Sequence, residues 1–218
     1  MGRKIYLSAE ADKRLHGFFV SQGYDVVSVR SDGIVSPPLS CHPDMFMCRL
    51  GYSDDAELIS CLGRDDTGLS PEYPRDIAYN AACTGRFFIH NLRYTAPALL
   101  KAAEDLGMIM VNVRQGYSKC STVIVDRDSI ITYDQGLAKS CAAAGLDVLT
   151  VSAGHVLLPG YDTGFIGGAS GRVGDTIYFN GDLSAHPDFD RIKEFISERG
   201  LGLTWFSEWP LTDIGSII

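Results

Sequence analysis

The chain of 218 residues lacks the features that mark several large classes of proteins. No apolar run approaches the ~18 residues that a membrane-spanning helix needs, so we expect no membrane partner. The first residues are basic, but no apolar stretch follows them, which argues against a secretory signal and predicts a cytoplasmic protein. The sequence has no P-loop, no Gly-x-Ser-x-Gly and no His-Glu-x-x-His motif, so these nucleotide-binding, serine-hydrolase and zinc-protease signatures are excluded.

Basic residues are also scarce. Nineteen Lys and Arg residues stand against 27 Asp and Glu residues, which gives a net charge of −8. An acidic chain repels phosphate backbones, so a nucleic-acid partner is disfavoured. The six cysteines are scattered without any Cys-x-x-Cys pair, which is typical of free thiols rather than of a disulfide framework. With 45% hydrophobic residues and no linker-like segment, we expect one domain over residues 1–218.

A repeated pattern organises the chain. Four glycines, Gly23, Gly107, Gly145 and Gly200, each follow a helical pattern and precede a short apolar strand. A glycine in this place is typical of a helix C-terminus. The spacing of apolar residues predicts helices over 10–22, 97–106, 137–144 and 189–196.

Two strands are predicted ahead of three of these helices, and the second strand of each pair ends in polar residues. The pairs cover 77–83 and 86–91, 121–125 and 128–134, and 164–168 and 175–182. The repeating unit is therefore strand–strand–helix–strand. The N-terminal region is a partial copy, a degenerate copy lies within 31–73 with a strand near 45–50, and the tail 208–218 adds a closing strand. About five such units repeat around a central axis.

This unit resembles the α/β-propeller of the guanidino-group-modifying, or pentein, superfamily, and the resemblance covers essentially the whole chain. Four local motifs are similar to those of an uncharacterised bacterial family placed in that superfamily. They are Gln115-Gly-Tyr-Ser-Lys-Cys-Ser, the segment 158–171, Gly181-Asp-Leu-Ser-Ala-His-Pro-Asp and Leu211-Thr-Asp-Ile-Gly-Ser. The fold that the resemblance implies is a single α/β domain, a pentein-like propeller.

Enzymes of the superfamily attack a guanidinium or amidine carbon with a cysteine, while a histidine transfers protons and carboxylates hold the nitrogens. Their cysteine normally lies close to the C-terminus, but here no cysteine follows Cys141. The superfamily also contains non-catalytic members. Two hypotheses therefore stand: a Cys-dependent hydrolase or transferase acting on a small guanidino- or amidine-type cation in a central acidic pocket, or a non-catalytic ligand- or partner-binding protein. Neither requires a cofactor.

Cys120 and His186 are the candidate catalytic residues. Lys119 beside Cys120 would favour the thiolate and activate a nucleophile. The alternative, a small buried residue at the start of a strand, is the commoner role of a lone cysteine. His186 is flanked by carboxylates and would transfer protons, while Asp188 after it is predicted to cap a helix. Cys141 falls on a helix core face and is predicted to be structural.

Asn91, Asp134 and Asp182 close equivalent strands. In a ring of repeats such positions face one another, and their side chains would form a negative pocket for a cation. Ordinary turn chemistry explains each of them singly. Asp162 and Ser170 flank a glycine-rich segment, and we include both as ligand-orienting residues.

The glycine-rich segment 164–174 has two interpretations. It is either a crowded turn near the axis or a loop that a ligand approaches closely, and we favour the second slightly. A separate cluster, Cys41, His42, Asp44 and Cys48, has metal-ligand residue types. Its spacing matches no established zinc motif, so an incidental loop is favoured and no metal is predicted.

Overall fold

The computed structural model describes residues 3–64 and 67–218, and within these ranges the chain is a mixed α/β protein. Its strands form five small sheets, none of which closes into a barrel. None of the helices in the described ranges has the length and apolarity that crossing a membrane requires.

Three of the sheets repeat one topology, in which the first two strands are antiparallel and the second and third are parallel. They contain β5 (Ala82–Cys83), β6 (Phe87–His90) and β7 (Ile109–Asn112); β8 (Thr122–Ile124), β9 (Ser129–Thr132) and β10 (Asp147–Thr150); and β11 (Ser170–Val173), β12 (Thr176–Phe179) and β13 (Gly202–Trp205). The helices α2 (Pro97–Asp105), α3 (Gln135–Ala144) and α4 (Phe189–Ser197) stand between the second and third strands. The predicted strand–strand–helix–strand unit is therefore present three times.

The first two sheets are reduced versions of this unit. Strand β1 (Lys4–Ser8) pairs in parallel with β2 (Asp25–Val29), with α1 (Lys13–Ser21) between them. Strand β3 (Met47–Arg49) pairs antiparallel with β4 (Leu58–Ser60), and among the described residues this sheet has no third strand and no α-helix of its own. This pair is the degenerate copy expected within 31–73.

The glycines after the four helices have the conformation that the sequence predicts. Gly23, Gly107, Gly145 and Gly200 have φ angles of 84°, 67°, 101° and 70°. A residue with a side chain is strained in this left-handed region, so glycine lets the chain leave each helix and enter the next strand.

Two predicted strands are wrong in their bounds. Of 77–83, only Ala82–Cys83 is a strand, because the chain turns at Ile77 and the Asn80 side chain binds another segment. The strand expected at 164–168 begins at Ser170 instead. The segment before it turns because its glycines pack directly against neighbouring backbone, as described below.

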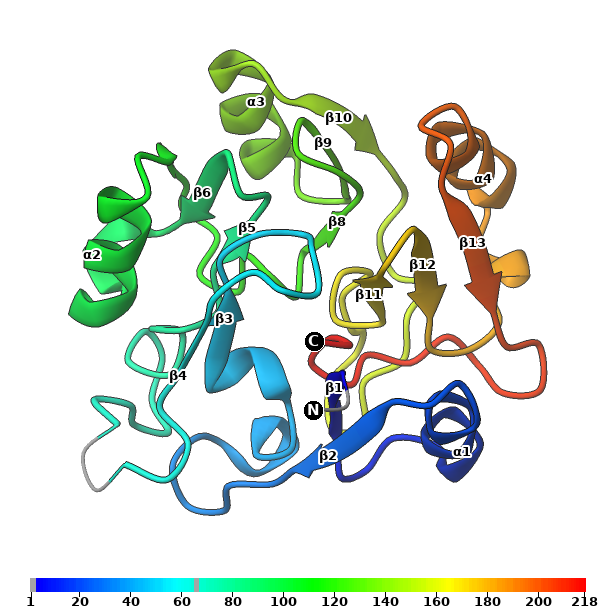
Figure 1. Ribbon diagram of the computed structural model, residues 1–218, viewed down its shortest axis with the longest axis horizontal. Coiled ribbons are helices and arrows are strands. Elements are labelled where there is room, and N and C mark those ends of the chain that lie inside the picture. The colour runs from blue at the N-terminus through cyan, green and yellow to red at the C-terminus, as the bar shows by residue number, and fades with distance from the viewer. Residues whose placement is uncertain (1–2, 65–66) are drawn as a thin grey trace.

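Each helix packs between two sheets. The buried face of α3, with Leu137 and Cys141, shares a cluster with Ile130 of its own sheet and Phe87 of the preceding sheet. A second cluster joins α4 to the sheets that contain β12 and β9. A third joins α1 to the sheets of β1 and β12. The fourth joins α2 to the sheets of β6 and β3, and Val29 of β2 packs in it as well. The five sheets are thus linked one to the next in a closed sequence. Figure 1 shows them around the middle of the molecule, with the helices outside.

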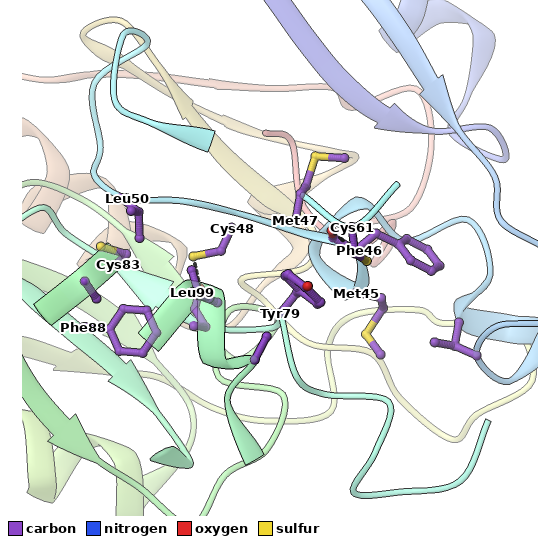
Figure 2. Close-up of a cluster of buried hydrophobic side chains, with 14 of the residues drawn as sticks. Met45, Phe46, Met47, Cys48, Leu50, Cys61, Tyr79, Cys83, Phe88 and Leu99 are labelled. Carbon is purple, nitrogen blue, oxygen red and sulfur yellow. Dashed lines mark hydrogen bonds between the residues drawn. The ribbon is translucent and has the colours of Figure 1, made fainter. Parts of the chain in front are cut away.

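The largest of these clusters anchors the segment that precedes β3. Figure 2 shows Met45, Phe46 and Met47 in a layer with Tyr79, next to Phe88 and further residues of the neighbouring unit. The side chains of Met45, Phe46 and Met47 are essentially inaccessible to solvent. Burial of each contributes about 1.5–3 kcal/mol. The backbone immediately before β3, including residues 42–44, is therefore held firmly.

The C-terminal tail joins two distant units without forming a regular strand. The backbone groups of Tyr6 and Ile218 exchange hydrogen bonds of 2.6 and 3.2 Å, and Ile217 N–H donates to the Ser170 carbonyl at 3.0 Å. The expected final strand is therefore replaced by irregular backbone pairing between β1 and β11. Trp209 anchors the tail by stacking on Phe206.

His90 makes the stability of the fold depend on pH. It is buried at the end of β6, where its ring nitrogens lie 2.7 Å from Thr95 Oγ1 and 3.1 Å from the Gly116 carbonyl. Burial lowers its pKa to about 4. The unfolded chain, with a histidine pKa of about 6.5, takes up the proton first as the pH falls, so the contribution of His90 to the free energy of unfolding should fall by about 3 kcal/mol between about pH 7 and pH 4.

Urea unfolding of wild type, His90→Asn and His16→Asn at both ends of this pH range checks the prediction. His90→Asn should be less stable near neutral pH but should lose about 3 kcal/mol less on acidification. His16→Asn, on α1, should keep the wild-type pH dependence. Equal slopes for wild type and His90→Asn would show that another group is responsible.

Candidate functional site

A buried polar cluster lies where four units approach one another. Asp44 precedes β3, Asn80 precedes β5, Cys120 precedes β8 and Gly168 precedes β11, each by two or three residues. The tail adds residues 213–216. The site is therefore built from the segments that lead into the first strands of four of the five sheets, together with the tail.

Cys120 is fixed in this cluster by neighbours from two other units. Its thiol donates a hydrogen bond to Asp44 Oδ2 at 3.0 Å, and Asn80 Nδ2 donates to its Sγ at 3.2 Å. Asn80 Oδ1 also accepts the backbone N–H groups of Lys119 and Cys120, at 2.9 and 3.2 Å. One amide side chain thus sets both the backbone and the thiol of Cys120, which is 2% exposed.

Asp44 has one satisfied and one unsatisfied carboxylate oxygen. Oδ2 accepts the Ser216 hydroxyl at 2.6 Å, and Lys119 Nζ in turn donates to Ser216 Oγ at 2.9 Å. Oδ1 is buried and has no partner. Burial raises the pKa of Asp44, while His42 and Lys119 act in the opposite direction.

His42 and Asp213 form the other side of the cluster. Asp213 is held by backbone N–H groups: Gly215 donates to Oδ1 at 3.0 Å and Phe165 donates to Oδ2 at 2.9 Å. Burial raises its pKa to about 6. His42 Nδ1 lies 3.8 Å from Asp213 Oδ1, is buried and has no hydrogen-bond partner. Burial lowers the pKa of His42, which favours the neutral imidazole.

These groups open into one small cavity of about 60 Å³. Its lining residues are His42, Cys120, Asp213, Leu39, Tyr117, Leu158, Tyr161, Thr163 and Phe165. Liquid water occupies about 30 Å³ per molecule, so the cavity has room for a small head group only. Tyr161 is 49% exposed and marks the side from which solvent reaches it.

The surroundings of the cavity favour a cation. Asp44, Asp213 and Asp76 are buried carboxylates, and Asp76 accepts the hydroxyl of the cavity residue Tyr117 at 2.6 Å. Lys119 is partly buried and is the cation closest to them among the described residues. Because charges interact more strongly away from bulk water, a net negative site of this kind attracts positive ligands.

Cys120 is protonated in this environment. Burial raises the pKa of its thiol well above the ordinary value, and Asp44 and Asp213 raise it further. The expectation that Lys119 activates the thiolate is therefore wrong for the ligand-free protein. Its ammonium group is directed to Ser216 and the Gly167 carbonyl, and the carboxylates dominate the field at the sulfur.

Residues 6–218 match the model of a family described as a family of unknown function, DUF6873. The chain belongs to this family. No curated protein and no solved structure matches it significantly. The chemistry of this DUF6873 protein must therefore be argued from its own site.

His186 does not lie in the cavity with Cys120. Its ring contacts that of His155, at a centroid distance of 5.2 Å, and its Nδ1 accepts the backbone N–H of Asp188. The histidine that lines the cavity is His42. Asp188 stands at the N-cap of α4, but its carboxylate accepts the Ser152 N–H and pairs with Arg191 instead of capping the first turn.

The polar ends of the middle strands have local roles. Asp134 caps α3 by accepting the Leu137 N–H and also accepts the Gln115 amide. Asp182 accepts the Ser184 N–H, and Asn91 begins a short 3₁₀ turn. None of the three lines the Cys120 cavity. The expected convergence of these side chains is therefore not observed, and turn chemistry explains them.

The other predicted binding residues are also outside the cavity. Asp162 is exposed, and Ser170 is buried with its hydroxyl donating to the Gly167 carbonyl. The glycines between them favour the crowded-turn interpretation. A Cβ on Gly167 would lie 2.4 Å from the Lys119 carbonyl, and one on Gly168 would lie 2.0 Å from Asp213 Oδ1.

The side chains of Cys41, His42, Asp44 and Cys48, whose metal-binding interpretation was the disfavoured one, do not form one group among the described residues. The Cys48 thiol donates to the Ala81 carbonyl, and Cys41 lies beside Ser40. His42 and Asp44 belong to the cavity site instead, which the sequence interpretation missed. The sequence offers one signal for this site. An amphipathic helix follows the His-Pro-Asp tripeptide that begins at His186, but none follows the same tripeptide that begins at His42.

The close contact between Gly168 and Asp213 can be tested. Gly168→Ala should lower the free energy of unfolding by about 1–3 kcal/mol, because the added methyl group overlaps the carboxylate and neither side has room to move. Gly17→Ala, in α1 with open space around the new methyl group, should instead raise it by about 0.5–1 kcal/mol. Chemical denaturation of both variants measures the difference, and a neutral Gly168→Ala would contradict the contact.

Proposed function

We propose that this chain is a pentein-like α/β-propeller protein of the cytoplasm that binds a small guanidino- or amidine-type cation and cleaves one of its C–N bonds with Cys120. The closed sequence of five sheets and the three complete strand–strand–helix–strand units support the propeller. The resemblance to the superfamily supplies the reaction class.

One observation carries the proposal: a thiol, an imidazole and a carboxylate from separate segments line the same small cavity. Cys120, His42 and Asp213 come from separate parts of the chain, and Asp44 lies behind the thiol. A nucleophile, a proton-transfer group and anionic binding groups are the parts that this reaction needs.

The cavity suits a flat cationic head group. Guanidinium and amidinium donate paired hydrogen bonds that match carboxylates. Asp213 lines the cavity, and Asp44 adds a second carboxylate behind the Cys120 thiol, to which it is hydrogen-bonded. Tyr117 and Phe165 supply aromatic walls, which attract cations through their ring faces.

The proposed reaction has two steps. The Cys120 sulfur attacks the central carbon of the cation, its proton passes to the unpartnered nitrogen of His42, and the C–N bond breaks as the leaving amine takes that proton. Water then adds to the carbon, the C–S bond breaks and the thiol is restored. A bound cation would offset the repulsion between the thiolate and the neighbouring carboxylates, so the nucleophile forms when the substrate is present.

A binding protein without turnover is the second candidate. It is favoured by the hydrogen bond from the Cys120 thiol to Asp44, which holds the sulfur protonated in the ligand-free protein. The same cation would then bind without forming a covalent bond.

An electrophilic amidine tests whether Cys120 lies at a cation-binding site, and a turnover assay with guanidines and amidines then separates the two candidates. 2-Chloroacetamidine should alkylate Cys120 with loss of chloride, and the rate should exceed that of neutral 2-chloroacetamide by about tenfold or more after normalisation to a free thiol. A hydrogen bond to a charged group contributes about 1.5–3 kcal/mol, and 1.4 kcal/mol is a factor of ten. Peptide mass spectrometry locates the adduct.

Three variants serve as controls. Cys141→Ala removes another buried thiol and should leave the labelling unchanged, whereas Cys120→Ala should abolish it. Asp213→Asn should reduce the preference for the amidine. Equal rates for the two reagents at Cys120 would reject cation recognition, and labelling without turnover of any guanidine or amidine would leave the binding protein.

A further inference from the structure

The cavity also assembles metal-ligand atoms. One ligand atom each from His42, Cys120 and Asp213 lies within 4.8 Å of the others. Among residues 3–64 and 67–218, no other group of three or more potential metal ligands lies as close together. The three residues are 4%, 2% and 3% exposed. In a tetrahedral site, zinc bonds of about 2.3 Å to sulfur and about 2.0 Å to nitrogen place the ligand atoms about 3.3–3.6 Å apart, so binding one ion requires an inward movement of the side chains by about 1 Å.

An unsatisfied group points independently to a missing ligand. His42 Nδ1 is buried without a hydrogen-bond partner, and 3.8 Å separates it from Asp213 Oδ1. Leaving a buried polar atom unpaired costs free energy, so native structures rarely keep such atoms without a reason. Asp44 Oδ1, in the same cluster, is also unpaired.

The donor set selects the class of ion. A thiolate, an imidazole and a carboxylate suit zinc and similar borderline transition ions, whereas calcium and magnesium prefer oxygen ligands alone. With Cys120 and Asp213 ionised, the two ligand charges neutralise a divalent ion. Binding releases the thiol proton to the buffer as the metal–sulfur bond forms.

Neighbouring groups already orient the ligands. Two backbone N–H groups hold the Asp213 carboxylate, and Asn80 Nδ2 contacts the Cys120 sulfur. Outer contacts of this kind fix ligand geometry in metal sites. All three ligands line the cavity, so a fourth coordination position is open to water or to a small ligand.

We propose that His42, Cys120 and Asp213 form a binding site for one divalent transition ion of the zinc class, with its fourth position facing the cavity. The site does not rest on the proposed reaction, because the ligand atoms are present whether or not Cys120 is a nucleophile. The two uses of Cys120 exclude each other, so a bound ion protects the thiol from alkylation.

Metal-free protein titrated with Zn²⁺ tests the proposal. Native mass spectrometry should detect one ion per chain, and competition with a chromophoric chelator gives the affinity. Co²⁺ should give a sulfur-to-metal charge-transfer band that Cys120→Ala lacks. His42→Gln and Asp213→Asn should each weaken binding by about a hundredfold or more, since even outer contacts of metal sites contribute 10–100-fold.

Matched controls separate ligation from charge and from folding. Cys141→Ala, His186→Gln and Asp188→Asn remove a buried group of each type outside the ligand set and should bind Zn²⁺ like the wild type. Circular dichroism verifies that each variant is folded. In the wild type, Zn²⁺ should also raise the unfolding temperature, and a chelator should reverse the rise.

Two results would overturn the site: no bound Zn²⁺ in folded wild-type protein, or unchanged binding in folded variants of all three ligands. Zinc binding without amidine-selective labelling of the metal-free protein rejects the proposed function alone. Amidine-selective labelling without zinc binding rejects the metal site alone.

Discussion

The structure depends on sharing each helix between two sheets. Sheets of two or three short strands bury too little apolar surface to be stable alone. In this chain the deficit is met by placing every helix against its own sheet and its neighbour, as Leu137 and Cys141 of α3 do between Ile130 and Phe87. A unit that shares its core with both neighbours cannot be removed without exposing theirs, so the sheets stabilise one another in sequence.

The same arrangement determines where polar groups can be buried. The segments before the first strands approach one another, and there the apolar clusters give way to Asp44, Cys120 and Asp213. Burying such groups is unfavourable, which is why the pKa values of both carboxyl groups are raised. Hydrogen bonds from the backbone N–H groups of Phe165 and Gly215 offset the cost of burying Asp213. Among the described residues, no hydrogen-bond partner offsets the cost of burying His42 Nδ1. Groups left unsatisfied inside a firmly packed frame are typical of sites arranged for a ligand.

The sequence predicts the elements of this fold better than its centre. The helices and the glycines after them are local features, and apolar spacing together with the need for positive φ is enough to find Gly23 or Gly145. The sequence singles out Cys120 as a candidate nucleophile because a lysine and a strand flank it, and Cys120 lines the cavity. The sequence does not pair it with His42, because the two segments are about 80 residues apart and no local pattern encodes a contact over such a distance. The polar residues at strand ends suggest a site because they repeat, yet Asp134 caps α3 and Asp182 caps a short 3₁₀ turn, which are local roles.

The hydrogen bonds around Asp44 join residues that are very distant along the chain. Its partners Cys120 and Ser216 are 76 and 172 residues away in sequence. Contacts of such separation carry a large loop-closure entropy and are made late when a chain folds. The helices and hairpins can therefore form while the cavity is still absent. The cavity is therefore the part of the molecule whose formation requires the first and last units to have met.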